Sequence, residues 1–378
     1  IEVFDEAERC WEETPDPDWI AHYQPELDNL RSALDWALAA PGRRQIGFDL
    51  AASGIMLLRS LWLIAEGRTY LDRLIPFLDA QTPPATTARL LNHAAGVYLS
   101  VRDPAGLALA ERSAALYREL DHRQGLASAL LNVASYKMRQ GQHAETQALL
   151  AEVRHLLTDT TFKKSQLTLM VCAGLASNYM HDIPNAARHF SEALETAKTL
   201  GTASEPTILT NLGVQEYMLG NIDRAIELTQ MALSRSTAHL GRNSRGIILT
   251  NLGAYLLAGE RIAEARSRLE EAFSALVDAG NFAAPECLQP WAVLAGVEGR
   301  LIEAAQLIGF TDAARVRSAR TMDPAERRLY DRLMGILEAS LPPAELEAWK
   351  AEGARWSEAE AIAFITNRLL QASAPERP

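Results

Sequence analysis

The sequence has few aromatic residues, few cysteines and fewer basic than acidic residues. Aromatics make up 7% of the 378 residues, and the formal charge is −11. Such an acidic surface repels phosphate, so direct nucleic-acid binding is not expected. The three cysteines, Cys10, Cys172 and Cys287, stand far apart without CxxC spacing. Scattered thiols in odd number predict neither a disulfide framework nor a cysteine metal site, and they are typical of a cytoplasmic protein.

Several motifs of membrane insertion and catalysis are also missing. No run of about 18 apolar residues predicts a membrane span, and no GxxxxGK[ST] predicts a phosphate-binding loop. There is no GxSxG nucleophile turn, and the histidine pairs lack HxxxH spacing. We therefore expect no catalytic residue, no metal and no cofactor in this chain. The sequence begins with Ile and has no signal-peptide pattern, which favours a fragment of a longer protein.

A repeat of about forty residues is the strongest positive pattern. The stretch at 208–220 reads ILTNLGVQEYMLG, and the stretch at 248–259 reads ILTNLGAYLLAG. A turn signal follows eight to eleven residues after each equivalent position, so each unit predicts a helical hairpin. The equivalent positions, 39 or 40 residues apart, are Asn92, Asn132, Cys172, Asn211, Asn251 and Trp291.

The second half of each unit carries paired alanines seven residues apart, which places both on one helical face. The pairs are Ala186/Ala193, Ala225/Ala232 and Ala265/Ala272. Together with TNLG at 210–213 and 250–253, this pattern resembles the tetratricopeptide repeat. The usual first-helix Trp is Leu209 or Leu249, and the period is longer than in that family. The resemblance implies an all-α superhelix of helical hairpins, an α-solenoid, whose concave groove is lined mainly by the first helices.

The two ends of the chain carry a second resemblance. The segments are ELDNLRSALDWAL at 26–38, IAEGRTYLDRLI at 64–75, AAQLIGFTDAARVR at 304–317 and LEAWKAEGARWSEAEAIAF at 346–364. In this order they resemble the sensor region of bacterial STAND-class signal-transduction ATPases, many of which are transcriptional regulators. The resemblance implies parent ATPase and DNA-binding modules in cis, outside this chain. We expect an N-terminal linker helix and degenerate hairpin over 1–80, the repeat array over 85–318, and a helical cap and tail over 319–378.

The repeated asparagines are the main candidate binding residues. An amide side chain on successive first helices can donate to and accept from the backbone of an extended peptide, and peptide-binding tetratricopeptide proteins use Asn at the matching place. The alternative is that each amide bonds to the neighbouring helix and fixes the stacking. The candidates are Asn92, Asn132, Asn211 and Asn251.

Further candidates lie along the expected groove wall and in two basic patches. The wall residues are Tyr98, Arg139, Asn178, Tyr179, Tyr217 and Met218. The patches are Arg235, His239, Arg242 and Arg245, and then Arg315, Arg317, Arg320, Arg327 and Arg328. Wall aromatics can instead pack in the core, and the basic residues can be a solvated face with acidic neighbours. Arg242 and Arg245 are the pair expected to reach an anionic group in the groove.

These patterns predict a sensor and interaction domain. Its concave groove would bind a small molecule, a peptide or a protein, and occupancy would control a larger ATP-dependent transcriptional regulator. The alternative is a constitutive protein-protein interaction scaffold whose partner stays bound regardless of signal. An enzyme with an unrecognised site is the third hypothesis, and no motif supports it.

Overall fold

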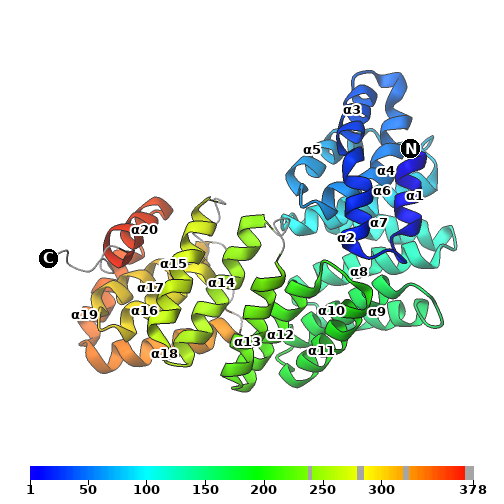
Figure 1. Ribbon diagram of the computed structural model, residues 1–378. Coiled ribbons are helices and arrows are strands. Elements are labelled where there is room, and N and C mark those ends of the chain that lie inside the picture. Colours follow the sequence, from blue (N-terminus) through cyan, green and yellow to red (C-terminus); the bar gives the residue numbers. More distant parts are fainter. Residues whose placement is uncertain (237–240, 279–284, 318–321, 323, 371–378) are drawn as a thin grey trace. The chain divides into compact units, whose positions relative to one another are not determined.

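The computed structural model describes residues 1–236, 241–278, 285–317, 322 and 324–370, except for a few side chains beside the gaps. Every regular element in these ranges is helical (Figure 1). The predicted all-α, tetratricopeptide-like class is confirmed. None of the described helices is both long enough and apolar enough to cross a bilayer.

The chain divides into two compact units, Ile1–Ile208 and Leu209–Pro378. Unit 1 begins with α1 (Glu2–Cys10), α2 (Asp16–Tyr23) and α3 (Leu27–Leu38). Its hairpins are α4 (Arg44–Ser60) with α5 (Ile64–Leu74), α6 (Pro84–Ser100) with α7 (Gly106–Glu119), α8 (Arg123–Arg139) with α9 (His143–Leu156), and α10 (Lys163–Tyr179) with α11 (Ile183–Leu200). The functional division at 1–80, 85–318 and 319–378 stays a prediction.

Unit 2 continues the hairpin pattern and ends in further helices. Its hairpins are α12 (Glu205–Leu219) with α13 (Ile222–Arg235), α14 (Gly241–Ala258) with α15 (Ile262–Asp278), and α16 (Pro285–Val297) with α17 (Leu301–Arg317). Helix α12 starts just before the unit boundary. After the last hairpin come α18 (Pro324–Ser340), α19 (Pro343–Gly353), α20 (Glu358–Phe364) and a π-helical turn over Ile365–Leu370.

A residue with a left-handed backbone conformation (positive φ) follows the first helix of each hairpin. These residues follow one another at intervals of 39 or 40: Trp62, Arg102, Gly141, His181, Gly220, Glu260 and Gly299. Glycine reaches a positive φ at no steric cost, whereas the other residue types are strained there. The turn signals that the sequence predicts within each repeat unit are therefore confirmed as turns between the two helices of each hairpin.

Close helix contact explains the small residues of the repeat. A Cβ on Gly213 would lie 2.9 Å from the Thr229 hydroxyl, and one on Gly253 would lie 2.6 Å from a methyl of Leu269. In each case the second helix of the same hairpin supplies the neighbour. The paired alanines Ala186/Ala193, Ala225/Ala232 and Ala265/Ala272 are all buried. The two helices of a hairpin thus cross with little side chain between them.

Candidate functional site

Two of the predicted asparagines bond to each other between adjacent first helices of unit 1. Asn132 on α8 donates its amide N–H to Asn92 Oδ1 at 2.8 Å and to the Asn92 carbonyl oxygen at 3.2 Å. Asn92 on α6 is buried and donates in turn to Ser128 Oγ at 2.9 Å. This arrangement stabilises the stacking of α6 on α8, as the structural alternative has it.

The equivalent asparagines of unit 2 differ from these in the hydrogen bonding of their side chains. Asn211 on α12 and Asn251 on α14 are half-buried. In the part of the chain that the structure describes, neither side-chain amide has a hydrogen-bond partner, although the backbone carbonyl of Asn211 accepts from Gln215 Nε2 at 3.3 Å. Each amide therefore keeps its donors and its acceptor available.

The wall residues of α6 and α8 are engaged within unit 1. Tyr98 is buried, donates its hydroxyl proton to Asp72, and lies under the Arg68 guanidinium at 4.3 Å from its ring centre. Burial first, and then the hydrogen bond and charge of Asp72, raise the pKa of Tyr98. Arg139 is exposed and donates to the carbonyl oxygen of Leu99 at 3.2 Å. Their contacts tie neighbouring hairpins together.

Two wall residues lie at the end of α10. Asn178 is half-buried, whereas the side chain of Tyr179 is 45% exposed. The neighbouring Met180 is exposed as well. An exposed tyrosine next to an exposed methionine is typical of protein interfaces, where both residue types are enriched.

The wall residues of α12 are covered by α18, a helix of the same unit. Arg328 donates to the carbonyl oxygen of Tyr217 at 2.5 Å and to that of Met218 at 3.5 Å, and its guanidinium lies 4.8 Å from the Tyr217 ring centre. Tyr217 is 2% exposed and stacks on Tyr255. One turn along α18, Arg332 donates to the carbonyl oxygen of Leu257 at 2.6 Å.

These two arginines donate to carbonyl oxygens in the last turns of α12 and α14, where positive charge favours the helix dipole. The sequence places Arg328 in a basic patch, but the spacing of the patch does not reveal what it contacts. Arg332 was not a candidate at all. In the other patch, exposed Arg245 lies 3.8 Å from Glu271, a local acidic neighbour. The side chain of Arg242 and all of His239 and Arg320 lie outside the described residues.

Two carboxylates between the end of α1 and the start of α2 bind backbone N–H groups elsewhere in unit 1. Glu12 accepts from the backbone N–H of Lys164 at 2.8 Å, and Asp16 accepts from the backbone N–H of Ala203 at 2.7 Å. Lys164 lies in the first turn of α10 and Ala203 just before α12, where backbone N–H groups lack partners within the helix. Lys164 Nζ also lies 2.5 Å from Asp16 Oδ1 and 3.7 Å from the Trp11 ring centre. Lys164 and Asp16 are both buried.

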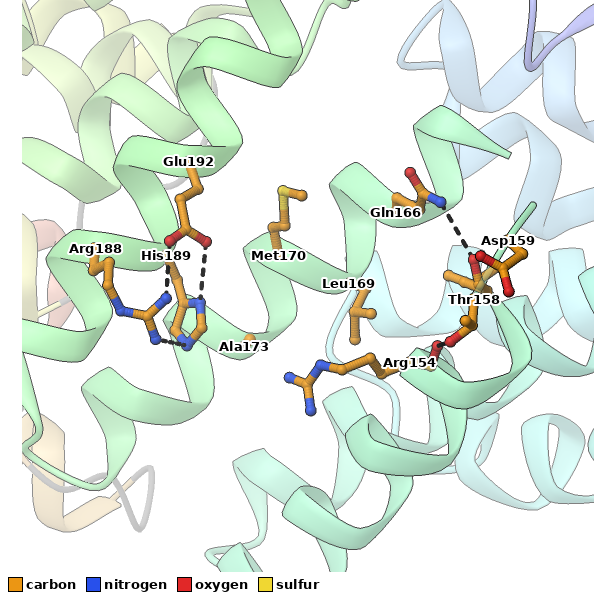
Figure 2. Close-up of a pocket in the computed structure, with 11 residues that line it drawn as sticks. Arg154, Thr158, Asp159, Gln166, Leu169, Met170, Ala173, Arg188, His189 and Glu192 are labelled. Carbon is orange, nitrogen blue, oxygen red and sulfur yellow. Dashed lines mark hydrogen bonds and ion pairs between the residues drawn. The ribbon is translucent and has the colours of Figure 1, made fainter. Parts of the chain in front are cut away.

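A cavity of about 540 Å³ opens between the second helices α9 and α11, with α10 as its floor (Figure 2). Figure 2 shows Arg154 extending from α9 on one side and Arg188, His189 and Glu192 from α11 on the other, with Leu169, Met170 and Ala173 of α10 between them. Its volume is within the range of small-molecule sites. The remaining lining residues are Leu157, Thr158, Asp159 and Gln166.

The polar groups of α11 in this cavity hold one another in place. Arg188 donates to Glu192 Oε1 at 2.8 Å and lies 3.3 Å from His189 Nε2. Burial first, and then the charge of Arg188, lower the pKa of His189; Glu192 opposes them, Arg154 adds a smaller lowering, and Asp182 opposes least. In the described structure, the Arg154 side chain has neither a hydrogen bond nor an ion pair. The sequence does not single out Arg154, Arg188 or Glu192, and His189 belongs to no pair with metal-ligand spacing.

Part of the chain matches a known family model. Residues 204–276 match the tetratricopeptide repeat. This range covers hairpins α12/α13 and α14/α15, which contain the best sequence copies of the repeat. No curated protein matches the chain.

Solved structures are similar over most of the chain. A Rap protein complexed with competence and sporulation factor has a TM-score of 0.57 at 14% identity, covering 89% of this chain and all of that one. A STAND protein with a tetratricopeptide repeat sensor, from Pyrococcus horikoshii, has a TM-score of 0.51 at 14% identity, covering 90% of this chain and 53% of that one. A Rap conjugation gene regulator of plasmid pLS20, in complex with the Phr* peptide, has a TM-score of 0.50 at 12% identity, covering 92% and 97%. At these identities the similarity establishes the fold.

Proposed function

We propose that the chain is a peptide-binding sensor domain of a larger ATP-dependent transcriptional regulator, and that Asn211 and Asn251 hold the backbone of the bound peptide. The observation that carries the proposal is the contrast between two pairs of equivalent asparagines. Asn132 donates to Asn92, which in turn donates to Ser128, whereas the side-chain amides of Asn211 and Asn251 in unit 2 have no hydrogen-bond partner among the described residues. Two such amides suit the alternating N–H and C=O groups of an extended peptide.

Two similar folds support a peptide as the ligand. The Rap structures contain a signalling factor and a peptide, and the STAND structure joins this kind of fold to an ATPase. In this proposal the parent ATPase and DNA-binding modules lie in cis, and the peptide shifts the equilibrium between their inactive and active states by binding one state more tightly. This chain itself has no catalytic role in the mechanism.

The test is a selection of displayed random peptides on the purified chain, followed by affinity measurements on the double variant Asn211→Ala/Asn251→Ala. Each lost hydrogen bond weakens binding by about 0.5–1.5 kcal/mol, so we expect a loss of roughly tenfold with an unchanged melting temperature. Asn367→Ala, at an exposed asparagine of the same unit, is the matched control and should bind normally. A large drop in melting temperature with retained affinity would assign the two amides to helix stacking instead.

A constitutive scaffold is the second candidate, favoured by exposed Tyr179 and Met180 at the end of α10. Such residues suit a protein partner that never leaves. The two functions differ in the full-length regulator. A sensor ligand should change nucleotide exchange, whereas a scaffold partner should bind the isolated chain and the regulator equally and leave exchange unaltered.

A further inference from the structure

The cavity between α9 and α11 shares no residue with the repeated asparagines. On α10 the equivalent of those asparagines is Cys172, and Met170 on the cavity floor stands two residues before it. Two residues correspond to about 200° around an α-helix, so the two side chains leave α10 on nearly opposite sides. A ligand that contacts Met170 in the cavity therefore lies on another side of α10 than Cys172.

The cavity combines an apolar floor with cationic groups on both sides. Leu157, Leu169 and Ala173 are buried and Met170 is half-buried, which gives a surface for hydrocarbon or aromatic groups. Arg188 is exposed at the cavity edge and pairs with Glu192 one turn along α11, which directs its guanidinium along that side of the cavity. Arg154 faces it from α9 without a partner in the described structure (Figure 2).

The acidic residues of the cavity do not remove its preference for an anionic ligand. Glu192 already bonds to Arg188, and Asp159 is exposed at the opposite end, where Figure 2 places it beside Thr158 and Gln166. His189 Nε2 lies 3.3 Å from Arg188, and its imidazole offers no negative group to attract a cation. The unsatisfied charge that faces the apolar floor is the guanidinium of Arg154.

From these contacts we infer that the cavity between α9 and α11 is a binding site for a small amphipathic carboxylate, whose charged group lies between Arg154 and Arg188 and whose apolar part covers Met170 and Leu169. Guanidinium groups bind carboxylates through paired, charge-assisted hydrogen bonds. The residues of this site all belong to unit 1, whereas Asn211 and Asn251 belong to unit 2, so this inference does not depend on the proposed function.

Isothermal titration of the full chain with decanoate tests the site, with decyltrimethylammonium and 1-decanol as probes of the same chain length. We expect saturable binding of one decanoate per chain and much weaker binding of the other two. Arg154→Gln and Arg188→Gln should each weaken decanoate binding by about tenfold, since each removes a charge-assisted contact. The matched control is Arg224→Gln, at an exposed arginine of α13 that pairs with Glu227 as Arg188 pairs with Glu192.

A second variant fills the cavity without changing a charge. Met170→Trp, at a half-buried position, should abolish decanoate binding while the circular dichroism spectrum and melting temperature stay those of the parent. Asn211→Ala/Asn251→Ala should bind decanoate normally, which separates this site from the peptide row. The inference is overturned if the cationic probe binds as well as decanoate, or if the arginine variants and Met170→Trp leave the titration unchanged.

Discussion

At the scale of single residues, two glycines in helices of unit 2 have opposite surroundings. A Cβ on Gly253 in α14 would lie 2.6 Å from a methyl of Leu269, which is fully buried, whereas a Cβ on Gly335 in α18 would meet nothing within 4 Å. Gly253→Ala should therefore destabilise the protein by about 1–3 kcal/mol through overpacking. Gly335→Ala should stabilise it by about 0.5–1 kcal/mol, because alanine loses less backbone entropy in a helix.

Urea denaturation followed by circular dichroism measures both changes. If the two substitutions shift the midpoint in the same direction, the close approach of α14 and α15 is not what requires glycine at 253. The sequence already indicates this glycine, since small residues recur in the repeat two positions after the asparagine. It does not indicate that Tyr217 lies beneath Arg328, because the two are 111 residues apart and no local pattern joins them.

At the scale of elements, the N-terminal segment of unit 1 depends on one buried ion pair. Lys164 at the start of α10 bonds to Asp16 Oδ1 at 2.5 Å and to the carbonyl oxygen of Thr14 at 2.7 Å. Lys164→Met leaves the buried Asp16 carboxylate without its cation, so we expect a loss of about 3–5 kcal/mol. Because α1 and α2 are joined through this segment, limited proteolysis should also cut between residues 10 and 16 more readily.

The double variant Lys164→Met/Asp16→Asn provides the control, since it removes both charges and should regain part of the lost stability. If the single and double variants have the same free energy of unfolding, the loss of Lys164 does not leave an unpaired buried charge on Asp16. Nothing in the sequence predicts this pair, whose members are 148 residues apart. The hairpins themselves could be predicted, because their boundaries follow from local turns repeated at a constant interval, as at Gly141 and Gly220.

At the scale of the whole molecule, the repeat predicts how many hairpins stack but not which surfaces stay open. The same position of the repeat holds Asn132, bonded to Asn92, and Asn251, whose amide has no partner in the described structure. Equivalent positions in the sequence thus differ in whether their side-chain amides are hydrogen-bonded in the folded chain. The cavity between α9 and α11 could not be predicted either, because it depends on side chains from three helices.

The acid stability of the molecule should depend on Glu8 in α1. Burial raises the pKa of Glu8, but hydrogen bonds and charges from His93 and Arg89 outweigh it and hold the pKa below its ordinary value of 4.5. A lowered folded-state pKa means that the ionised carboxylate stabilises the protein above pH 4.5, and that this contribution disappears as the pH falls through the folded-state pKa. Glu8→Gln should therefore be less stable than the parent at neutral pH, and the difference should shrink on acidification below pH 4.5. Denaturation curves at several pH values measure it, and a difference that stays constant down to strongly acidic pH would show that the ionisation of Glu8 is not coupled to folding.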